Sequence, residues 1–187
     1  MERKDYEANL ETAVSYMMAN QRANALSSLK MAYSQVPDKE KTSDNVAYLR
    51  ILSFLARFAL ENAEHIQAIN YINEGISLNN MHADMIFMNV LIYKATNRFP
   101  EMLTAIINYL IAIDLPDRDK YAYEFVNTVA LNELYVEYLP VAYSNTPNHT
   151  PILSIVEETI EKLKQIASGE FLEKGARIMK AIDSTNN

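Results

Sequence analysis

Two arginines and a serine form the most chemically suggestive pattern in the sequence. Arg50, Ser53 and Arg57 are separated by three and four residues, so their side chains align on one face of an α-helix. Two guanidinium groups in line can hold a carboxylate or a run of acidic side chains through charge-assisted hydrogen bonds. This stripe predicts a site for an acidic peptide or protein. In the alternative, both arginines pair with nearby carboxylates on a solvent-exposed face: Glu61, Asp84 or Asp44.

Apolar side chains expected on the same wall extend this candidate site. Methionines and an aromatic ring offer an adaptable apolar bed for a bound peptide. We expect Arg50, Arg57 and Lys94 to act as cationic anchors. The predicted partner-binding set is Met17, Met18, Arg50, Ser53, Arg57, Phe87, Leu91 and Lys94.

Other chemistries lack the residues that they need. The absence of Cys excludes disulfides, a thiolate nucleophile, Cys-ligated zinc and an iron–sulfur cluster. His65, His82 and His149 lie in or beside predicted turns without the spacing of a metal site, so we interpret them as surface residues. No glycine-rich phosphate loop and no Gly-x-Ser-x-Gly motif occurs. We therefore expect no enzyme activity, no metal and no cofactor.

Charge and hydropathy exclude two classes of partner. The chain has 17 Lys and Arg against 24 Asp and Glu, a formal charge of −7, whereas nucleic acids and anionic membranes require clustered cations. The tyrosines around Tyr121–Tyr143 have no interleaved Lys or Arg for nucleic-acid binding. The longest apolar stretches, Met85–Tyr93 and Ala105–Ile113, are far shorter than the ~20 residues of a membrane-spanning helix. With no export signal, the expected location is cytoplasmic.

The elements that must position these residues are helices. Apolar residues recur at steps of three and four along most of the chain, and no alternating strand pattern occurs. Ser43, Asp117 and Thr150 are candidate N-caps, and Pro140 is expected to end a helix. About nine helices are predicted: Asp5–Ala19, Asn24–Val36, Ser43–Asn62, Ile66–Leu78, Met81–Thr96, Phe99–Asp114, Asp117–Leu139, Thr150–Ile166 and Phe171–Ile182. The hairpin Met81–Ile113 is the most apolar and is expected at the centre, or in a homodimer interface if it is exposed.

Helix pairs recur along the first part of the chain. Successive pairs begin near Tyr6, Leu49 and Ala83, so the second spacing is 34 residues and the first is 43. The longer spacing includes a charged loop over Asp38–Ser43. Equivalent positions carry similar residues: small Ala13, Ala56 and loosely Val90; aromatic Tyr16 and Tyr93; Ala25 and Ala68, with Met102 as the exception; and a closing Pro37.

On these residues the chain resembles the tetratricopeptide repeat (TPR) family, whose unit is a 34-residue helical hairpin. The resemblance covers Tyr6–Asp114 well and Asp117–Leu139 weakly. The family's usual glycine at the turn within each hairpin is replaced by Asn20 and Asn97, which tolerate a left-handed backbone, and by Ala63, which does not.

The resemblance implies an all-α, right-handed superhelix of about three TPR-like hairpins plus C-terminal capping helices. Residues 1–139 would form the repeats, and residues 140–187 would form a helical hairpin cap of the same structural domain. Stacked hairpins would line a concave wall with the first helix of each pair. Some members hold a peptide's terminal carboxylate with a polar clamp, which is absent here because Leu10 and Val14 occupy its first-unit positions.

These observations predict a non-enzymatic scaffold that binds a protein or peptide along the concave wall. Two alternatives stay open. The chain also resembles helical-repeat segments attached to bacterial glycosyltransferases, in which the repeat is an accessory domain. A secretion or assembly chaperone that shields an apolar client is the other alternative, and its binding would survive high salt.

Overall fold

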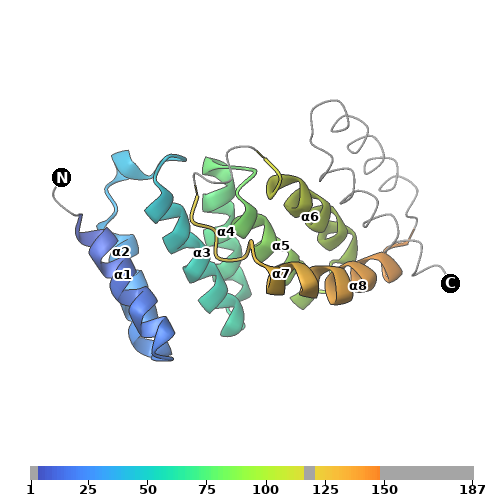
Figure 1. The fold of residues 1–187 in the computed structure, drawn as a ribbon, viewed down its shortest axis with the longest axis horizontal. Helices are drawn as coiled ribbons and strands as arrows, with labels where there is room; N and C mark the ends of the chain where they lie inside the picture. The colour runs from blue at the N-terminus through green and yellow to red at the C-terminus, as the bar shows by residue number, and fades with distance from the viewer. Residues whose placement is uncertain (1–3, 116–120, 148–187) are drawn as a thin grey trace.

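The computed structural model describes residues 4–115 and 121–147, which form helices joined by turns, with no β-strand among them (Figure 1). The predicted all-α class and the first six predicted helices are confirmed to within a few residues. The helices predicted over residues 150–166 and 171–182, and most of the predicted cap, lie outside the described residues. The α-helices are α1 (Asp5–Met18), α2 (Arg22–Gln35), α3 (Val46–Glu61), α4 (His65–Leu78), α5 (Ala83–Ala95), α6 (Phe99–Ala112), α7 (Thr128–Glu133) and α8 (Leu139–Ser144).

Successive helices pack as hairpins. Helix α1 packs on α2, α3 on α4, and α5 on α6, while contacts of α2 with α3 and of α4 with α5 join one hairpin to the next. Helix α3 also contacts both α1 and α5, so these three helices lie side by side (Figure 1). We call the side of the stack formed by α1, α3 and α5 the first-helix face.

The turn inside each hairpin is the same in all three. Asn20, Ala63 and Asn97 have φ angles of 56°, 58° and 56°, and in each turn the next residue's N–H donates to a carbonyl five residues earlier. This arrangement satisfies carbonyls that the helix end leaves free. The left-handed backbone expected at Asn20 and Asn97 is confirmed, and Ala63 adopts it as well although an alanine tolerates it poorly. The turns at Ala63 and Asn97 are 34 residues apart, as predicted for the helix pairs.

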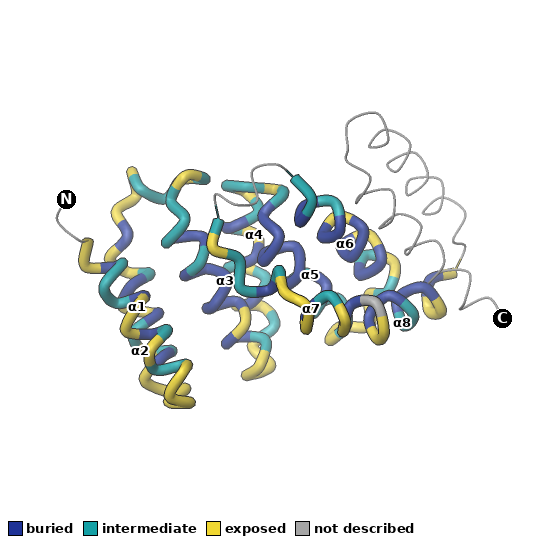
Figure 2. Tube along the Cα trace, in the orientation of Figure 1, coloured by how far each residue is buried: buried dark blue, intermediate teal, exposed yellow. Residues whose placement is uncertain are grey.

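Buried side chains form two clusters, and Figure 2 shows the buried residues concentrated along α3, α5 and α6. One cluster joins α1, α2 and α3, and the larger one joins α5 and α6 to the segment after Phe125. Helices α4 and α5 approach closely at Gly75, where an added Cβ would lie 2.6 Å from the Met85 sulfur. The apolar hairpin Met81–Ile113 is largely buried, and its side chains make up most of the larger cluster.

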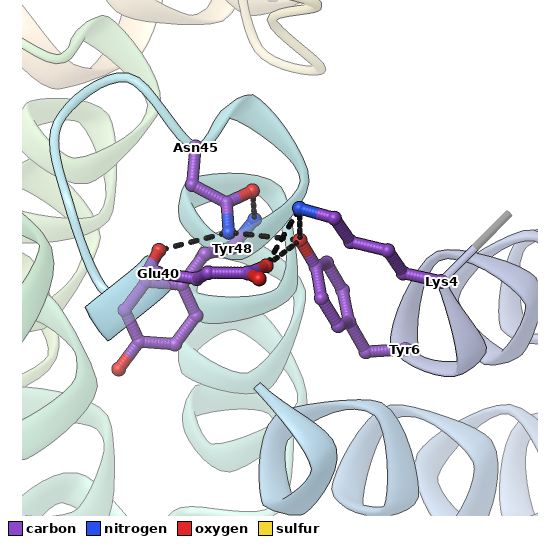
Figure 3. Close-up of polar contacts among 5 residues, drawn as sticks. All are labelled: Lys4, Tyr6, Glu40, Asn45 and Tyr48. Carbon is purple, nitrogen blue, oxygen red and sulfur yellow. Dashed lines mark hydrogen bonds and ion pairs between the residues drawn. The ribbon is translucent and has the colours of Figure 1, made fainter. Parts of the chain in front are cut away.

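A polar cluster fastens the loop between the first two hairpins to α1 (Figure 3). The Glu40 carboxylate accepts hydrogen bonds from Lys4 Nζ and from the Tyr6 hydroxyl, both at 2.7 Å. The Asn45 amide donates to the Glu40 carbonyl at 2.9 Å, and its Oδ1 accepts from Tyr48 N at 3.1 Å at the start of α3. The prediction of Ser43 as the N-cap is therefore wrong: Asn45 caps α3, because its amide serves the helix and the loop together.

The prediction of a helix from Asp117 to Leu139 is wrong in its first half. Residues 121–127 are not helical, and α7 begins only at Thr128, where Asn127 Oδ1 accepts from Ala130 N at 2.9 Å. Residues 116–120 lie outside the described part of the chain.

Pro140 does not end the helix as predicted. A π-helical turn, Leu134–Tyr138, leads directly into α8, whose first turn contains Pro140, so the chain stays helical to Ser144. The π turn resets the hydrogen-bond register directly before Pro140, so the helical stretch accommodates a residue that has no N–H to donate. The predicted boundary between residues 139 and 140 falls inside this stretch. Across the described ranges, no helix combines the length and the apolar character that crossing a membrane requires.

Candidate docking site

A segment of the chain itself crosses the first-helix face. Residues 121–127, which we call the strap, run over α3 and α5 immediately before α7 (Figure 1). Asp84 at the start of α5 holds the strap backbone: its two carboxylate oxygens accept from Glu124 N at 2.9 Å and from Phe125 N at 3.0 Å. Asp84 is 1% exposed, so one buried carboxylate satisfies two N–H groups that a helix would satisfy internally.

The strap also inserts an aromatic ring. Phe125 stacks on Phe87 of α5, with ring centroids 5.4 Å apart and an interplanar angle of 10°. The Arg57 guanidinium lies 5.4 Å from the Phe125 centroid, within the range of a cation–π contact. The Tyr109 hydroxyl of α6 donates to the Phe125 carbonyl. The ring is thereby fixed between α3 and α5.

Two of the three predicted cationic anchors pair with the segment that begins at the strap. Arg50 Nε donates to Glu124 Oε1 at 2.7 Å, and Lys94 pairs with Glu137. Lys94 Nζ also lies 4.5 Å from the centroid of the Tyr138 ring. The structure therefore places an acidic segment on the stripe, as the sequence predicts for a partner, but the segment belongs to the same chain.

The third anchor shows the alternative pairing. Arg57 Nε donates to Glu61 Oε1 at 2.9 Å, one helical turn further along α3, and Arg22 of α2 contacts the same carboxylate. Glu61 is one of the carboxylates that the alternative interpretation names. Arg57 thus has an acidic neighbour on its own helix and an aromatic one on the strap.

A pocket of about 660 Å³ lies beside the strap, between α3, α5 and α7. We call it the strap pocket. Arg57, Phe87 and Leu91, all predicted site residues, meet at its wall. Its remaining apolar wall comes from Leu60, Phe125, Val129, Ala130 and Tyr138. The structure therefore brings three predicted residues from two helices to one hollow.

The other predicted residues lie elsewhere. Ser53 is buried and its hydroxyl donates to the Leu49 carbonyl at 3.1 Å, so it presents no group to a partner. Met17 packs on the cluster of α1, α2 and α3, and Met18 is exposed at the end of α1; neither lines the strap pocket. Phe87 is buried as well and forms part of the pocket wall instead of an open apolar bed.

A second pocket, of about 600 Å³, lies between α1, the loop before α3 and the strap. We call it the amino-terminal pocket. Arg50 and Ala122 form its strap side, and the cluster of Lys4, Tyr6 and Glu40 forms another part of its wall (Figure 3). Sequence reasoning missed this hollow because the loop that closes it was expected only to lengthen the connection between hairpins.

Two buried titratable groups lie under the strap. The prediction of His82 as a surface residue is wrong: it is 3% exposed and packs edge-on to Tyr121 and Tyr123, at centroid distances of 5.2 and 4.9 Å. Its Nδ1 has no hydrogen-bond partner among the described residues. Burial lowers the pKa of His82 to about 4, because the charged imidazolium is poorly solvated there.

Burial acts in the opposite direction on the neighbouring carboxyl group. It raises the pKa of Asp84 to about 6, although the hydrogen bonds from Glu124 and Phe125 and the charge of Arg50 oppose that rise. His82 and Asp84 are thus two groups with perturbed pKa values beneath one segment, and both owe the perturbation to being covered.

No protein-family model matches the chain, and neither a curated protein nor a solved structure matches it. Within residues 4–115 and 121–147, no group of three or more His, Asp or Glu side chains is arranged to hold a metal ion. The chemistry that the described site offers is recognition: a carboxylate for backbone N–H groups, guanidinium groups for carboxylates, and an aromatic slot.

Proposed function

We propose that this chain is a non-enzymatic, tetratricopeptide-like scaffold that docks a segment of a partner protein on the first-helix face. The observation that carries the proposal is the strap. Helices α3 and α5 hold a non-helical peptide segment through its backbone, through Glu124 and through Phe125. A surface that satisfies backbone, charge and aromatic groups of one such segment has the chemistry to dock another.

The strap pocket supplies the site for an anchoring side chain. Bound segments gain most of their affinity from a few bulky residues that fill desolvated hollows. Leu60, Phe87 and Leu91 give this pocket an apolar wall, and Val129 at its edge is 69% exposed. An exposed valine beside an apolar hollow favours a surface that a partner covers.

The recurring hairpins support the family assignment within this proposal. Three equivalent turns, two of them 34 residues apart, and paired helices joined in sequence are the features that a stacked repeat requires. In such a stack the first helices share one wall, and α3 and α5 of that wall carry the strap pocket.

Site-specific photocrosslinking tests the proposal. A benzophenone amino acid replaces Val129 at the pocket edge, and a matched control replaces Met31, which is 50% exposed on α2. After irradiation in cells that produce the protein, we expect a discrete protein adduct from position 129 and none from position 31. Leu91→Lys is expected to abolish that adduct, because a charge would then line the apolar pocket. Equal adducts at both positions, or an adduct unchanged by Leu91→Lys, would refute the assignment.

The exposed apolar side chains of α7 and the π turn favour one second candidate, shielding of an apolar client. Val129 and Val136 are 69% and 70% exposed and carry no charge to steer a partner. Repeating the crosslinking with Arg50→Glu separates the two functions. A client held by apolar contacts alone keeps its adduct, whereas a partner whose acidic residue must pair with Arg50 loses it.

A further inference from the structure

The strap separates two hollows of the same face. Ala122 and Arg50 line the amino-terminal pocket, whereas Glu124 and Phe125 line the strap pocket. The two pockets have volumes of about 600 and 660 Å³. Removal of the strap would therefore join them into one groove along α1, α3 and α5.

The strap contacts that face as a ligand would. Beside the contacts of Tyr121 and Tyr123, the groups that the helices recognise belong to Glu124 and Phe125. The recognising residues, Arg50, Asp84 and Phe87, come from helices some forty to seventy positions earlier in the chain. The recognised features are two consecutive backbone N–H groups, one carboxylate and one aromatic ring. Such a short pattern can be carried by another protein.

The charges on the two sides are complementary. Residues 121–138 contain Glu124, Glu133 and Glu137 and no Lys or Arg. The opposing helices supply Arg50, Arg57 and Lys94, of which Arg50 and Lys94 pair with this segment. A segment that carried a basic residue in place of Glu124 would face the Arg50 guanidinium and be repelled.

From these contacts we infer that the strap is a displaceable internal ligand, and that the partner docks an extended segment with an acidic residue followed by an aromatic one in its place. This inference rests on the proposed docking function and adds its regulation and the chemistry of the partner. Strap and partner exclude each other, because Asp84, Arg50 and the Phe87 ring each serve one segment at a time. The strap thus competes with the partner from within the chain, and the partner must bind the face tightly enough to displace it.

A peptide supplied in trans tests the inference. The probe is a fluorescein-labelled peptide of residues 121–131, and fluorescence anisotropy measures its binding to the full chain. The strap-disabled protein carries Glu124→Ser and Phe125→Ser, so that position 124 has no charge to pair with residue 50. We expect the peptide to bind this variant at least about ten-fold more tightly than the wild type, because the face is then free for most of the time. Equal affinity for both proteins would overturn the inference, since the peptide would then bind away from the strap's site.

A charge swap provides the matched control. Adding Arg50→Glu to the strap-disabled protein is expected to weaken binding of the probe about ten-fold or more. A second peptide, with Lys in place of the acidic residue that corresponds to Glu124, is expected to recover most of that loss. Failure of the swapped peptide to recover binding would show that Arg50 does not contact the peptide residue that corresponds to Glu124.

Displacement of the strap can also be tested on the wild-type protein, where no substitution can disturb folding. Excess probe peptide is expected to accelerate hydrogen exchange at the Glu124 and Phe125 amides, whose N–H groups Asp84 holds in the closed state. Unchanged exchange at both amides, with peptide bound, would overturn displacement of the strap. The Val129 crosslink reports on docking independently: its presence without displacement leaves the proposed function standing, and its absence removes both.

Discussion

Acidification acts in opposite directions on the two buried groups beneath the strap. Burial lowers the pKa of His82 from 6.5 to about 4, so the unfolded chain takes up this proton first, and stability is lost as the pH falls from 6.5 towards 4. Burial raises the pKa of Asp84 from 3.8 to about 6, so here the folded chain takes up the proton first. Protonation of Asp84 therefore raises the unfolding free energy as the pH falls through 6 towards 3.8, and this gain is lost as the pH rises again.

The two effects are of similar size. Between pH 7 and pH 4.5, the depressed pKa of His82 is expected to lower the unfolding free energy by about 2 kcal/mol. The raised pKa of Asp84 is expected to increase it by about 2 kcal/mol. In the wild type they largely cancel. In His82→Phe only the gain from Asp84 remains, and in Asp84→Asn only the loss from His82 remains. We therefore expect the two variants to diverge in opposite directions from the wild type on acidification.

Urea unfolding followed by far-ultraviolet circular dichroism at pH 7 and pH 4.5 measures this divergence. The quantity compared is the change in unfolding free energy between the two pH values within each protein, so a substitution's constant cost cancels. Exposed carboxylates whose ion pairs lower their pKa values, such as Asp38, Glu40 and Glu101, affect all three proteins alike. Parallel pH profiles for the wild type and both variants would refute the reasoning, because neither group would then be buried as described.

Three further tests use substitutions at a hairpin turn, at the strap and at the start of α3. Ala63→Gly is expected to raise the unfolding free energy by about 1 kcal/mol in urea titrations, because Ala63 has a φ angle of 58°; an unchanged or lower midpoint contradicts this. Phe125→Ala is expected to lower the unfolding free energy by about 3 kcal/mol and Val129→Ala by under ~0.5 kcal/mol, since the Phe125 side chain is buried and the Val129 side chain is exposed; similar losses in urea titrations would contradict the strap packing. Asn45→Ala is expected to reduce thermal stability by about 1 kcal/mol while Ser43→Ala leaves it unchanged, and the reverse result would restore Ser43 as the cap.

Local patterns determine the parts of the fold that the sequence predicted well. Helices α1 to α6 follow from apolar spacing, and the left-handed turns follow from Asn20 and Asn97 standing where a glycine is usual. In the site, Arg57 and Leu91, which the sequence assigns to one wall, both line the strap pocket, because position on a helix determines which way each side chain faces.

The strap could not be predicted in this way. Its residues, Tyr121 to Asn127, fit a helical pattern locally, but Asp84 binds the N–H groups of Glu124 and Phe125 from 40 and 41 residues away. Tertiary contacts thus override a local preference. Long separations in sequence likewise concealed the pairing of Arg50 with Glu124, 74 residues apart, and the cover that Tyr121 and Tyr123 place over His82.

The pairing of the cationic stripe within the chain changes what the stripe contributes to docking. If a partner's carboxylate replaces that of Glu124 at Arg50, one ion pair is exchanged for another, and the number of pairs on the face stays the same. Exposed pairs of this kind contribute little net free energy, whereas a mismatched charge is strongly unfavourable. The arginine therefore selects which segments are admitted, and the affinity comes from filling the hollow beside Phe87 and Leu91. On this reasoning a substitution at Arg50 changes the choice of partner, and a substitution at Leu91 changes how tightly any partner is held.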